Sequence, residues 1–113
     1  MANEEECRAA LELIRTRLSA VDPELFTRHV VERTITCRVP DLGVVWRSRI
    51  HAGGLDPFEI TADPGDGQVR VTVGSDDLVA LAKEELHAGR AWATGRLKIE
   101  ASLRDLLRLR TLL

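Results

Sequence analysis

Hydrophobic residues near the start of the chain recur with the period of a helix. One narrow stripe of that helix holds Cys7, Ala10, Leu11, Ile14, Leu18 and Val21, as expected for an amphipathic helix that packs on a core. Asn3 and Glu6 have the spacing of a capping box, and the acidic residues between them suit the positive end of the helix dipole. The pattern predicts a first helix over residues 4–20. Asp22 and Pro23 then predict the start of a short helical turn.

From residue 30 onward, apolar and polar residues alternate with the period of two that is typical of strands. This alternation predicts strands over residues 34–39, 44–50, 58–61, 68–73 and 96–100. The pair Gly53-Gly54 and the segment 64–67 supply the turns between them. Pro57 favours a position at the sheet edge for the third strand.

Two further helices are predicted in the second half of the chain. Ser75, followed by Asp76 and Asp77, caps the first of them, and Gly89 is its C-cap candidate. Ser102 caps a last helix that runs to the chain end. Each clear strand is apolar on one face only, so helices should cover one side of a mainly antiparallel sheet and leave the other side in solvent. The prediction is an α+β two-layer sandwich with a five-stranded sheet, in one domain over residues 1–113.

Composition narrows the class of protein. The 113 residues are 44% hydrophobic and 30% charged, with a formal net charge of −2, whereas a protein that coats nucleic acid has a strong basic excess. The apolar runs are too short to span a bilayer, and the acidic start MANEEEC is the reverse of a secretory signal. Two cysteines are too few for a disulfide framework. We therefore expect a cytoplasmic domain that does not bind nucleic acid.

The sequence contains no pattern that predicts catalysis. The three histidines, His29, His51 and His87, share no ligand spacing with a cysteine or carboxylate, so neither a metal site nor a cofactor is predicted. Cys7 and Cys37 lie on apolar faces and are expected to be buried. The hydroxyl and carboxylates at the start of the third helix are explained by capping and by the helix dipole.

The polar face of the predicted sheet is strongly basic. Six cations share it against the lone Glu100 on the clear strands: Arg38, Arg47, Arg49, Arg70, Arg96 and Lys98. One interpretation is a solubilising face that also prevents strand pairing with other chains. The other is docking on anionic lipid headgroups or on an acidic partner.

The last helix has more leucine than one packed face requires. Its leucines spread over about 220° of the helical wheel, against a stripe of about 100° for a surface helix. They are Leu103, Leu106, Leu107, Leu109, Leu112 and Leu113. Either the helix is wedged between other elements, or some leucines face a ligand cavity or a second protein chain.

The second half of the chain resembles the sterol carrier protein 2 family. A strand leads into SDDLVAL at residues 75–81, then Gly89, Ala91-Trp92, GRLKI at residues 95–99 and a leucine-rich helix. The segment TCRVPDLGVVWRSRI at residues 36–50 is similar to the first hairpin of that family, with Trp46 at its aromatic position. Fourteen arginines against two lysines are typical of a bacterial member.

The resemblance implies a sheet in the order 3-2-1-4-5 under helices that enclose an apolar tunnel. It implies non-catalytic binding or transfer of a fatty acid, acyl-CoA or sterol. We expect the tunnel to be lined by Ile14, Leu18, Ile35, Trp46, Ile50, Val71, Leu97, Leu103, Leu106 and Leu107. Trp92 would lie at its mouth if a bulge near Gly95 turns the strand.

A second hypothesis assigns the chain to a different class. In it the protein is an interaction module, either a homodimer or a subunit that docks on a lipid-metabolising enzyme through the last helix. The direction of the surplus leucines separates the two hypotheses: a void beside them favours lipid carriage, and solvent or a second chain favours association.

Overall fold

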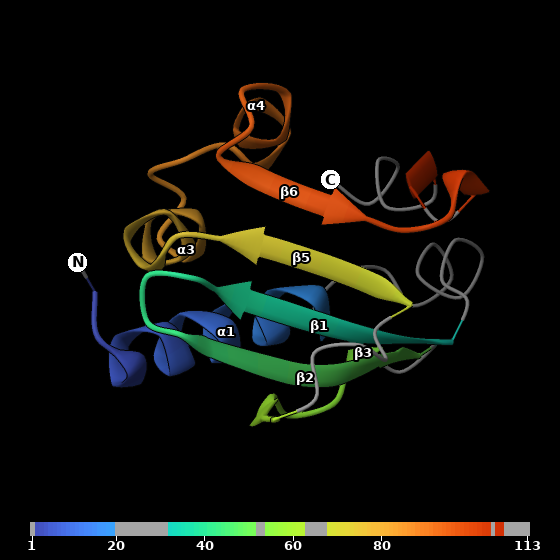
Figure 1. The fold of residues 1–113 in the computed structure, drawn as a ribbon, viewed down its shortest axis with the longest axis horizontal. Helices are drawn as coiled ribbons and strands as arrows, with labels where there is room; N and C mark the ends of the chain where they lie inside the picture. Colours follow the sequence, from blue (N-terminus) through green and yellow to red (C-terminus); the bar gives the residue numbers. More distant parts are fainter. Residues whose placement is uncertain (1, 20–31, 52–53, 63–67, 105, 108–113) are drawn as a thin grey trace.

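A single twisted sheet organises the chain in the computed structural model, which describes residues 2–19, 32–51, 54–62, 68–104 and 106–107 (Figure 1). The helices are α1 (Glu4–Ser19), α3 (Ser75–Ala82) and α4 (Ala88–Ala93). The strands are β1 (Arg33–Val39), β2 (Val44–His51), β3 (Gly54–Leu55), β4 (Glu59–Ile60), β5 (Val69–Val73) and β6 (Leu97–Glu100). The predicted turn after Asp22 lies outside the described residues.

The strand order is β3-β2-β1-β5-β6, with β4 also paired to β2. β4 corresponds to the predicted third strand, whereas β3 includes Gly54, where a turn was predicted. Both short strands pair with the same side of β2, so the order agrees with the expected 3-2-1-4-5. The sheet is mixed, since β1 and β5 run parallel while the other pairs are antiparallel. The chain crosses from β4, beside β2, to β5 on the other side of β1, so these two strands are not joined by a hairpin.

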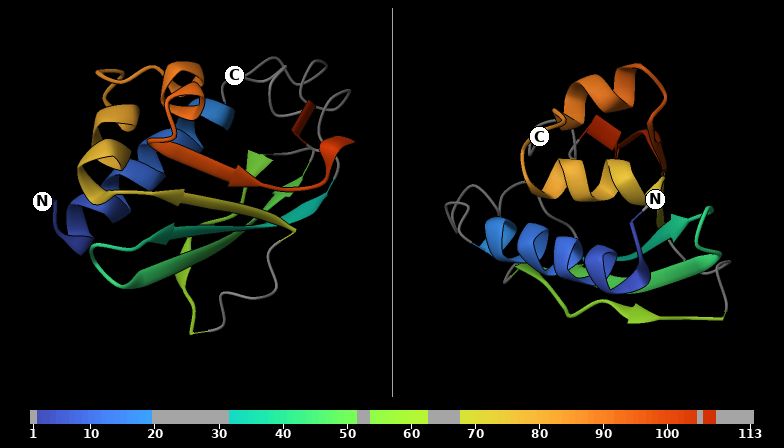
Figure 2. Two further views of the ribbon diagram at one scale, coloured as in Figure 1. Left: turned by 45° about the horizontal axis from the view of Figure 1, so that its top comes forward. Right: turned by 90° about the vertical axis from the view of Figure 1, so that its left-hand side faces the viewer.

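The helices cover one face of the sheet, as the one-sided apolar pattern predicts (Figure 2). From that face the core receives Cys37, Val39, Trp46, Ile50, Val73 and Leu97. Opposite them, the helices contribute Cys7, Ala10, Leu11, Leu78, Ala82 and Ala91 to the same cluster. Each Å² of apolar surface that is buried stabilises the fold by about 25 cal/mol. This layer is therefore the main source of stability.

The predicted capping box at the start of α1 is present. Asn3 Oδ1 accepts from the Glu6 backbone N–H at 2.8 Å, and Glu6 Oε1 accepts from the Asn3 N–H at 3.2 Å. Two otherwise unpaired N–H groups are thereby satisfied. The described part of this helix runs to Ser19, the last residue before a stretch that lies outside the described residues.

The start of α3 differs from the prediction that Ser75 is its cap. Gly74 occupies the N-cap position, and Ser75 is the first helical residue, 1% exposed. Asp41, in the turn between β1 and β2, accepts hydrogen bonds from the Ser75 backbone N–H at 3.0 Å and from its hydroxyl. A carboxylate that is distant in sequence therefore caps the helix and ties it to the hairpin.

The segment after α3 was also predicted incorrectly. The helix ends at Ala82, and Glu84 adopts a positive φ of 62° in the turn that follows. A separate helix, α4, contains both Gly89, predicted as a C-cap, and Trp92, predicted on a strand. Turn residues around Glu84 break the helical pattern earlier than the glycine suggested, and apolar Ala91 completes the buried face of α4.

We predict that Asp41→Asn lowers stability near neutral pH but not in strong acid. Hydrogen bonds from Ser75 hold the pKa of Asp41 below its ordinary value of 3.8. The carboxylate therefore stabilises the fold above the unfolded-state pKa, and this contribution is lost as the pH falls through the lower folded-state pKa. Urea midpoints of the wild type and the variant should differ at about pH 7 and converge at about pH 2. An equal difference at both pH values would contradict this role.

Candidate functional site

The apolar face of the sheet collects most of the side chains expected to line a tunnel. Trp46 is 0% exposed, and Ile50 and Leu97 are nearly as buried. Half-buried side chains pack against the same cluster: Ile14, Ile35, Val71 and Trp92. Trp92 reaches this cluster from α4 rather than through a strand bulge. The residues that β1, β2, β5 and β6 place by alternation thus share one apolar layer with α1 and α4.

Trp46 carries an unpaired polar group in this layer. Its indole Nε1 is the single buried side-chain nitrogen or oxygen atom without a hydrogen-bond partner among the described residues. A buried donor left unpaired costs about 1–3 kcal/mol. Trp46 is therefore a fully buried large ring whose N–H donates to no group of the described chain.

Both cysteines lie in the same apolar layer, as predicted. They are free thiols, 0% exposed at Cys7 and 4% at Cys37. Burial raises the pKa of Cys7 and raises that of Cys37 to about 12. Since the thiolate is the reactive form, neither side chain has the environment of a nucleophile.

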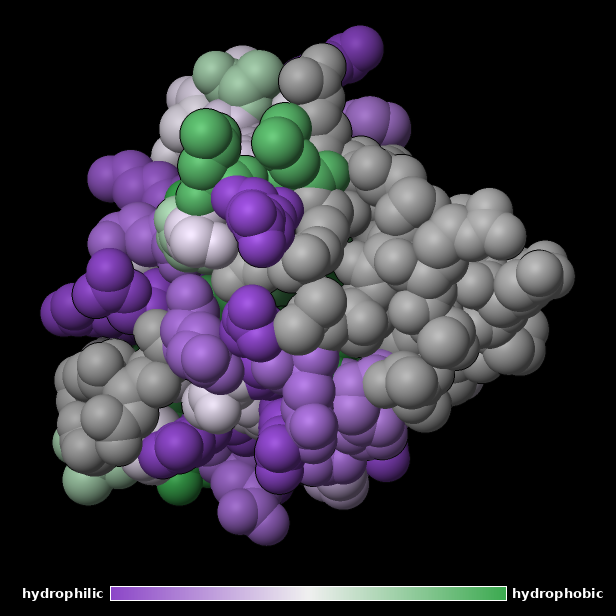
Figure 3. All heavy atoms as spheres, turned by 90° about the vertical axis from the view of Figure 1, so that its right-hand side faces the viewer, coloured by the Kyte–Doolittle hydropathy of each residue, from purple (hydrophilic) through white to green (hydrophobic). Residues whose placement is uncertain are grey.

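The leucines of the last helical segment do not all join the core. This segment begins after Ser102, whose carbonyl accepts from the Leu106 N–H at 2.9 Å. Leu103 is 75% exposed and Leu107 is 58% exposed, whereas Leu106 is half-buried. Exposed hydrophobic side chains gather at this end of the molecule, which faces the viewer in Figure 3. The side chains of Leu18, Leu109, Leu112 and Leu113 lie outside the described residues.

The described residues contain no group of three or more His, Cys, Asp or Glu that could hold a metal ion. His51 lies 2.9 Å from Asp56 at the end of β2, and His87 caps α4 by accepting from the Arg90 N–H. His29 falls outside the described part of the chain. None of the described helices has the length and apolar character needed to cross a membrane.

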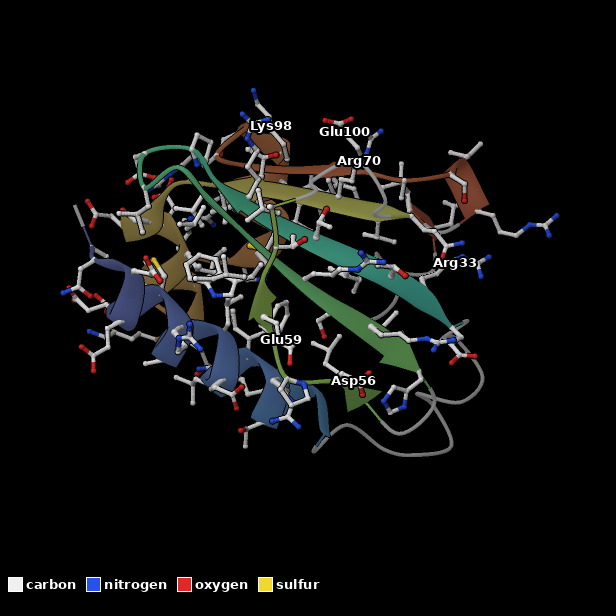
Figure 4. All side chains as sticks on the ribbon, turned by 60° about the horizontal axis from the view of Figure 1, so that its bottom comes forward. Arg33, Asp56, Glu59, Arg70, Lys98 and Glu100 are labelled. Carbon is white, nitrogen blue, oxygen red and sulfur yellow. The ribbon has the colours of Figure 1, made fainter. Side chains whose placement is uncertain are left out.

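The opposite face of the sheet is basic, but less uniformly than the sequence indicated. Three of the six predicted cations form ion pairs: Arg49 with Glu32 at 2.5 Å, Arg70 with Glu100 at 3.1 Å and Arg96 with Asp77 at 2.5 Å. Figure 4 shows Arg70 and Glu100 side by side on adjacent strands.

Sequence alternation missed other carboxylates near this face. An open hollow of about 490 Å³ lies where β2 meets the β3–β4 segment, and its charged lining is Glu32, Arg33, Arg47, Arg49, Asp56 and Glu59. Glu32 precedes β1, Asp56 lies between β3 and β4, and Glu59 is on β4. No long alternating run in the sequence indicates a sheet face at these positions. Glu59 lies on this face because it pairs with Arg47 in the register between β4 and β2.

Comparison with protein families decides the relationship. The sequence profile of the SCP-2 sterol transfer family matches residues 13–113. The chain belongs to this family. The match includes every described strand and all of α3 and α4, and it confirms the resemblance seen in the sequence. Comparison with curated proteins gave no match.

Solved structures share the fold at low sequence identity. Sterol carrier protein 2 like 2 from Aedes aegypti is 21% identical with a TM-score of 0.64, over 96% of this chain and 97% of that one. Sterol carrier protein-2 from the same organism, solved in complex with the C16 fatty acid palmitate, is 18% identical with a TM-score of 0.60, over 99% and 96% of the two chains.

An SCP-2-like fold also occurs within a larger enzyme. The sec-alkylsulfatase Pisa1 from Pseudomonas sp. is 19% identical with a TM-score of 0.61 over 88% of this chain. The matching region is only 16% of the sulfatase chain. At these identities the likeness concerns the fold.

We predict that Trp46→Phe and Trp46→Ala differ sharply in stability. The phenylalanine keeps most of the buried ring and removes the unpaired donor, so the loss should stay below about 1.5 kcal/mol. The alanine leaves a cavity and should cost about 3–5 kcal/mol. Urea unfolding monitored by circular dichroism measures both. Equal losses in the two variants would contradict this prediction.

Proposed function

We propose that the protein is a non-catalytic carrier that binds a lipid between the apolar face of the sheet and the helices. The observation that carries this proposal is the match of the SCP-2 sterol transfer family over residues 13–113. A fold neighbour solved with palmitate supports a ligand with a long acyl chain. A fatty acid, an acyl-CoA or a sterol would fit this class of site, and we further propose a bacterial, cytoplasmic protein.

The proposed wall is the apolar layer together with the half-buried leucine of the last segment. Trp46, Ile50 and Leu97 would form its floor, and Leu106 would close it from the side. Ile14, Leu18, Ile35, Val71 and Trp92 complete the proposed lining, while Leu103 and Leu107, both exposed, would contribute only if the segment turns inward on binding.

Transfer of the acyl chain from water would drive binding. Each buried methylene contributes about 0.8 kcal/mol, and the layer presents mainly carbon and sulfur to a ligand. Trp46 Nε1, which has no hydrogen-bond partner among the described residues, would be the donor for a lipid headgroup. One donor fixes little of a ligand's shape, so selectivity among acyl chains should be broad.

A second function is favoured by the exposure of Leu103 and Leu107. Large exposed apolar side chains mark association surfaces when they cluster, and the sulfatase neighbour carries this fold as a small part of an enzyme chain. In this alternative the last helix mediates a homodimer or docks on a lipid-metabolising enzyme.

Native mass spectrometry separates the two functions. The purified protein is recorded before and after incubation with a mixture of fatty acids and sterols. The carrier function predicts a monomer with an adduct of defined lipid mass. A dimer that takes up no lipid would overturn it and support the association function.

We predict that Leu106→Glu lowers affinity for a fluorescent fatty acid by at least about tenfold, because a carboxylate beside the acyl chain must lose its hydration. Leu13→Glu is the matched control, since Leu13 is 43% exposed on α1 and lies outside the proposed wall. Both variants are first checked for folding by circular dichroism. If folded Leu106→Glu binds as tightly as the control, Leu106 does not line the site.

A further inference from the structure

The basic face of the sheet divides into neutralised and unneutralised cations. Arg49, Arg70 and Arg96 are engaged by carboxylates. Within the described part of the chain, Arg38, Arg47 and Lys98 take part in no ion pair. We call these three residues the outer cluster.

Strand register places the outer cluster on neighbouring positions of one surface. Arg38 on β1 pairs with Thr72 on β5, and Thr72 pairs with Lys98 on β6. The two cations thus flank a threonine on one row across the sheet, with backbones about 10 Å apart. Arg47 lies on the next row, since it pairs with Thr36, two residues before Arg38. Lys98 stands apart from the Arg70–Glu100 pair in Figure 4.

Protection of sheet edges does not account for this cluster. Cations that prevent strand addition belong on edge strands, and Lys98 on β6 fits that role. Arg38 lies on β1, between β2 and β5, and Arg47 lies on β2, which is paired on both sides. Two of the three charges therefore lie where no strand could add.

Arg47 lies next to Thr36 in the strand register. Thr36 is only 3% exposed although it faces outward, and its register neighbours are Arg47 and Arg70. Arginine stems on both sides of a threonine can cover it while their charged ends stay in water. Arg47 has Glu59 of β4 as its register neighbour but not as its ion-pair partner. Arg38 and Lys98, which have no acidic neighbour in the register, carry most of the unbalanced charge.

We propose that this face docks on the surface of an anionic phospholipid bilayer, with the outer cluster held against the phosphate groups and Thr72 between Arg38 and Lys98 as a hydroxyl donor. The proposal goes beyond lipid carriage and does not depend on it, because the docking face is the one opposite the helices.

The chemistry of the face favours a lipid surface over the other anionic partners. Hot spots of protein interfaces are aromatic side chains and arginines that fill well-packed, desolvated pockets, and single-stranded nucleic acids stack on aromatic rings. Among the residues that the structure describes, the large exposed hydrophobic ones are Leu13, Ile60, Leu103 and Leu107, and none of these four lies among the cluster and its threonines. Charge and hydroxyl groups without an apolar anchor suit phosphate headgroups, to which each nearby cation adds about fivefold in affinity.

Sedimentation with vesicles tests the proposal on the whole, lipid-free protein. One set of vesicles contains phosphatidylserine mixed with phosphatidylcholine, and the other contains phosphatidylcholine alone. The test variant combines Arg38→Gln, Arg47→Gln and Lys98→Gln, which keeps part of each stem. The control combines Arg8→Gln, Lys83→Gln and Arg90→Gln, exposed positions on or next to the helices, so both variants change the net charge equally.

The wild type should bind the phosphatidylserine vesicles more tightly than the neutral ones, and added salt should weaken this binding. The test variant should lose about 100-fold in affinity, the product of three fivefold steps, while the control keeps most of it. Equal loss in both variants would mean that net charge alone acts, and a larger loss in the control would place docking on the helices. Either result, or a wild type that does not prefer the anionic vesicles, overturns the proposal. None of these results changes the outcome of the native mass spectrometry that tests lipid carriage.

Discussion

The fold depends on the opposite chemistry of the two faces of one sheet. Along β1 and β2, alternate residues point to opposite sides, so Cys37 and Trp46 enter the core while their neighbours Arg38 and Arg47 face water. A shift of one residue in this register would exchange the two sets. The cost of burying guanidinium groups and exposing a tryptophan fixes the pairing, and the helices can then cover only the apolar side.

The same constraint separates two possible activities in space. A lipid chain needs the apolar layer beneath the helices, whereas anionic headgroups need the cations on the far side. Asp41 connects the hairpin of this sheet to the start of α3, so the helical cover is attached at a fixed point. The other end of the cover, at residues 102–107, exposes apolar side chains instead of burying them. At that end, the described residues cover the proposed site least.

Features set by local repetition were predictable from the sequence. The capping box at Asn3, the one-sided strands, the burial of both cysteines and the strand order followed from spacing or from the family resemblance. The errors arose where long-range contacts decide. Asp41 caps a helix 34 residues away, and no local signal indicates it. Trp92 was placed on the last strand, with a bulge near Gly95, by following the family resemblance, whereas it lies in the short helix α4.

Some residues of the candidate site were likewise predictable from local alternation, and others were not. Alternation identified the sheet residues of the apolar layer, because their side of the sheet is fixed by parity alone. It could not decide the leucines of the last segment, since a wide apolar arc fits burial, a ligand or a partner equally well. Nor could it give the balance of charge on the outer face, where Glu32 and Glu59 lie near the basic rows from outside the long strands. Only the register across β1, β5 and β6 reveals that Arg38 and Lys98 flank a threonine with no carboxylate opposite them. The chemistry of this face therefore follows from strand pairing and not from the number of cations in the sequence.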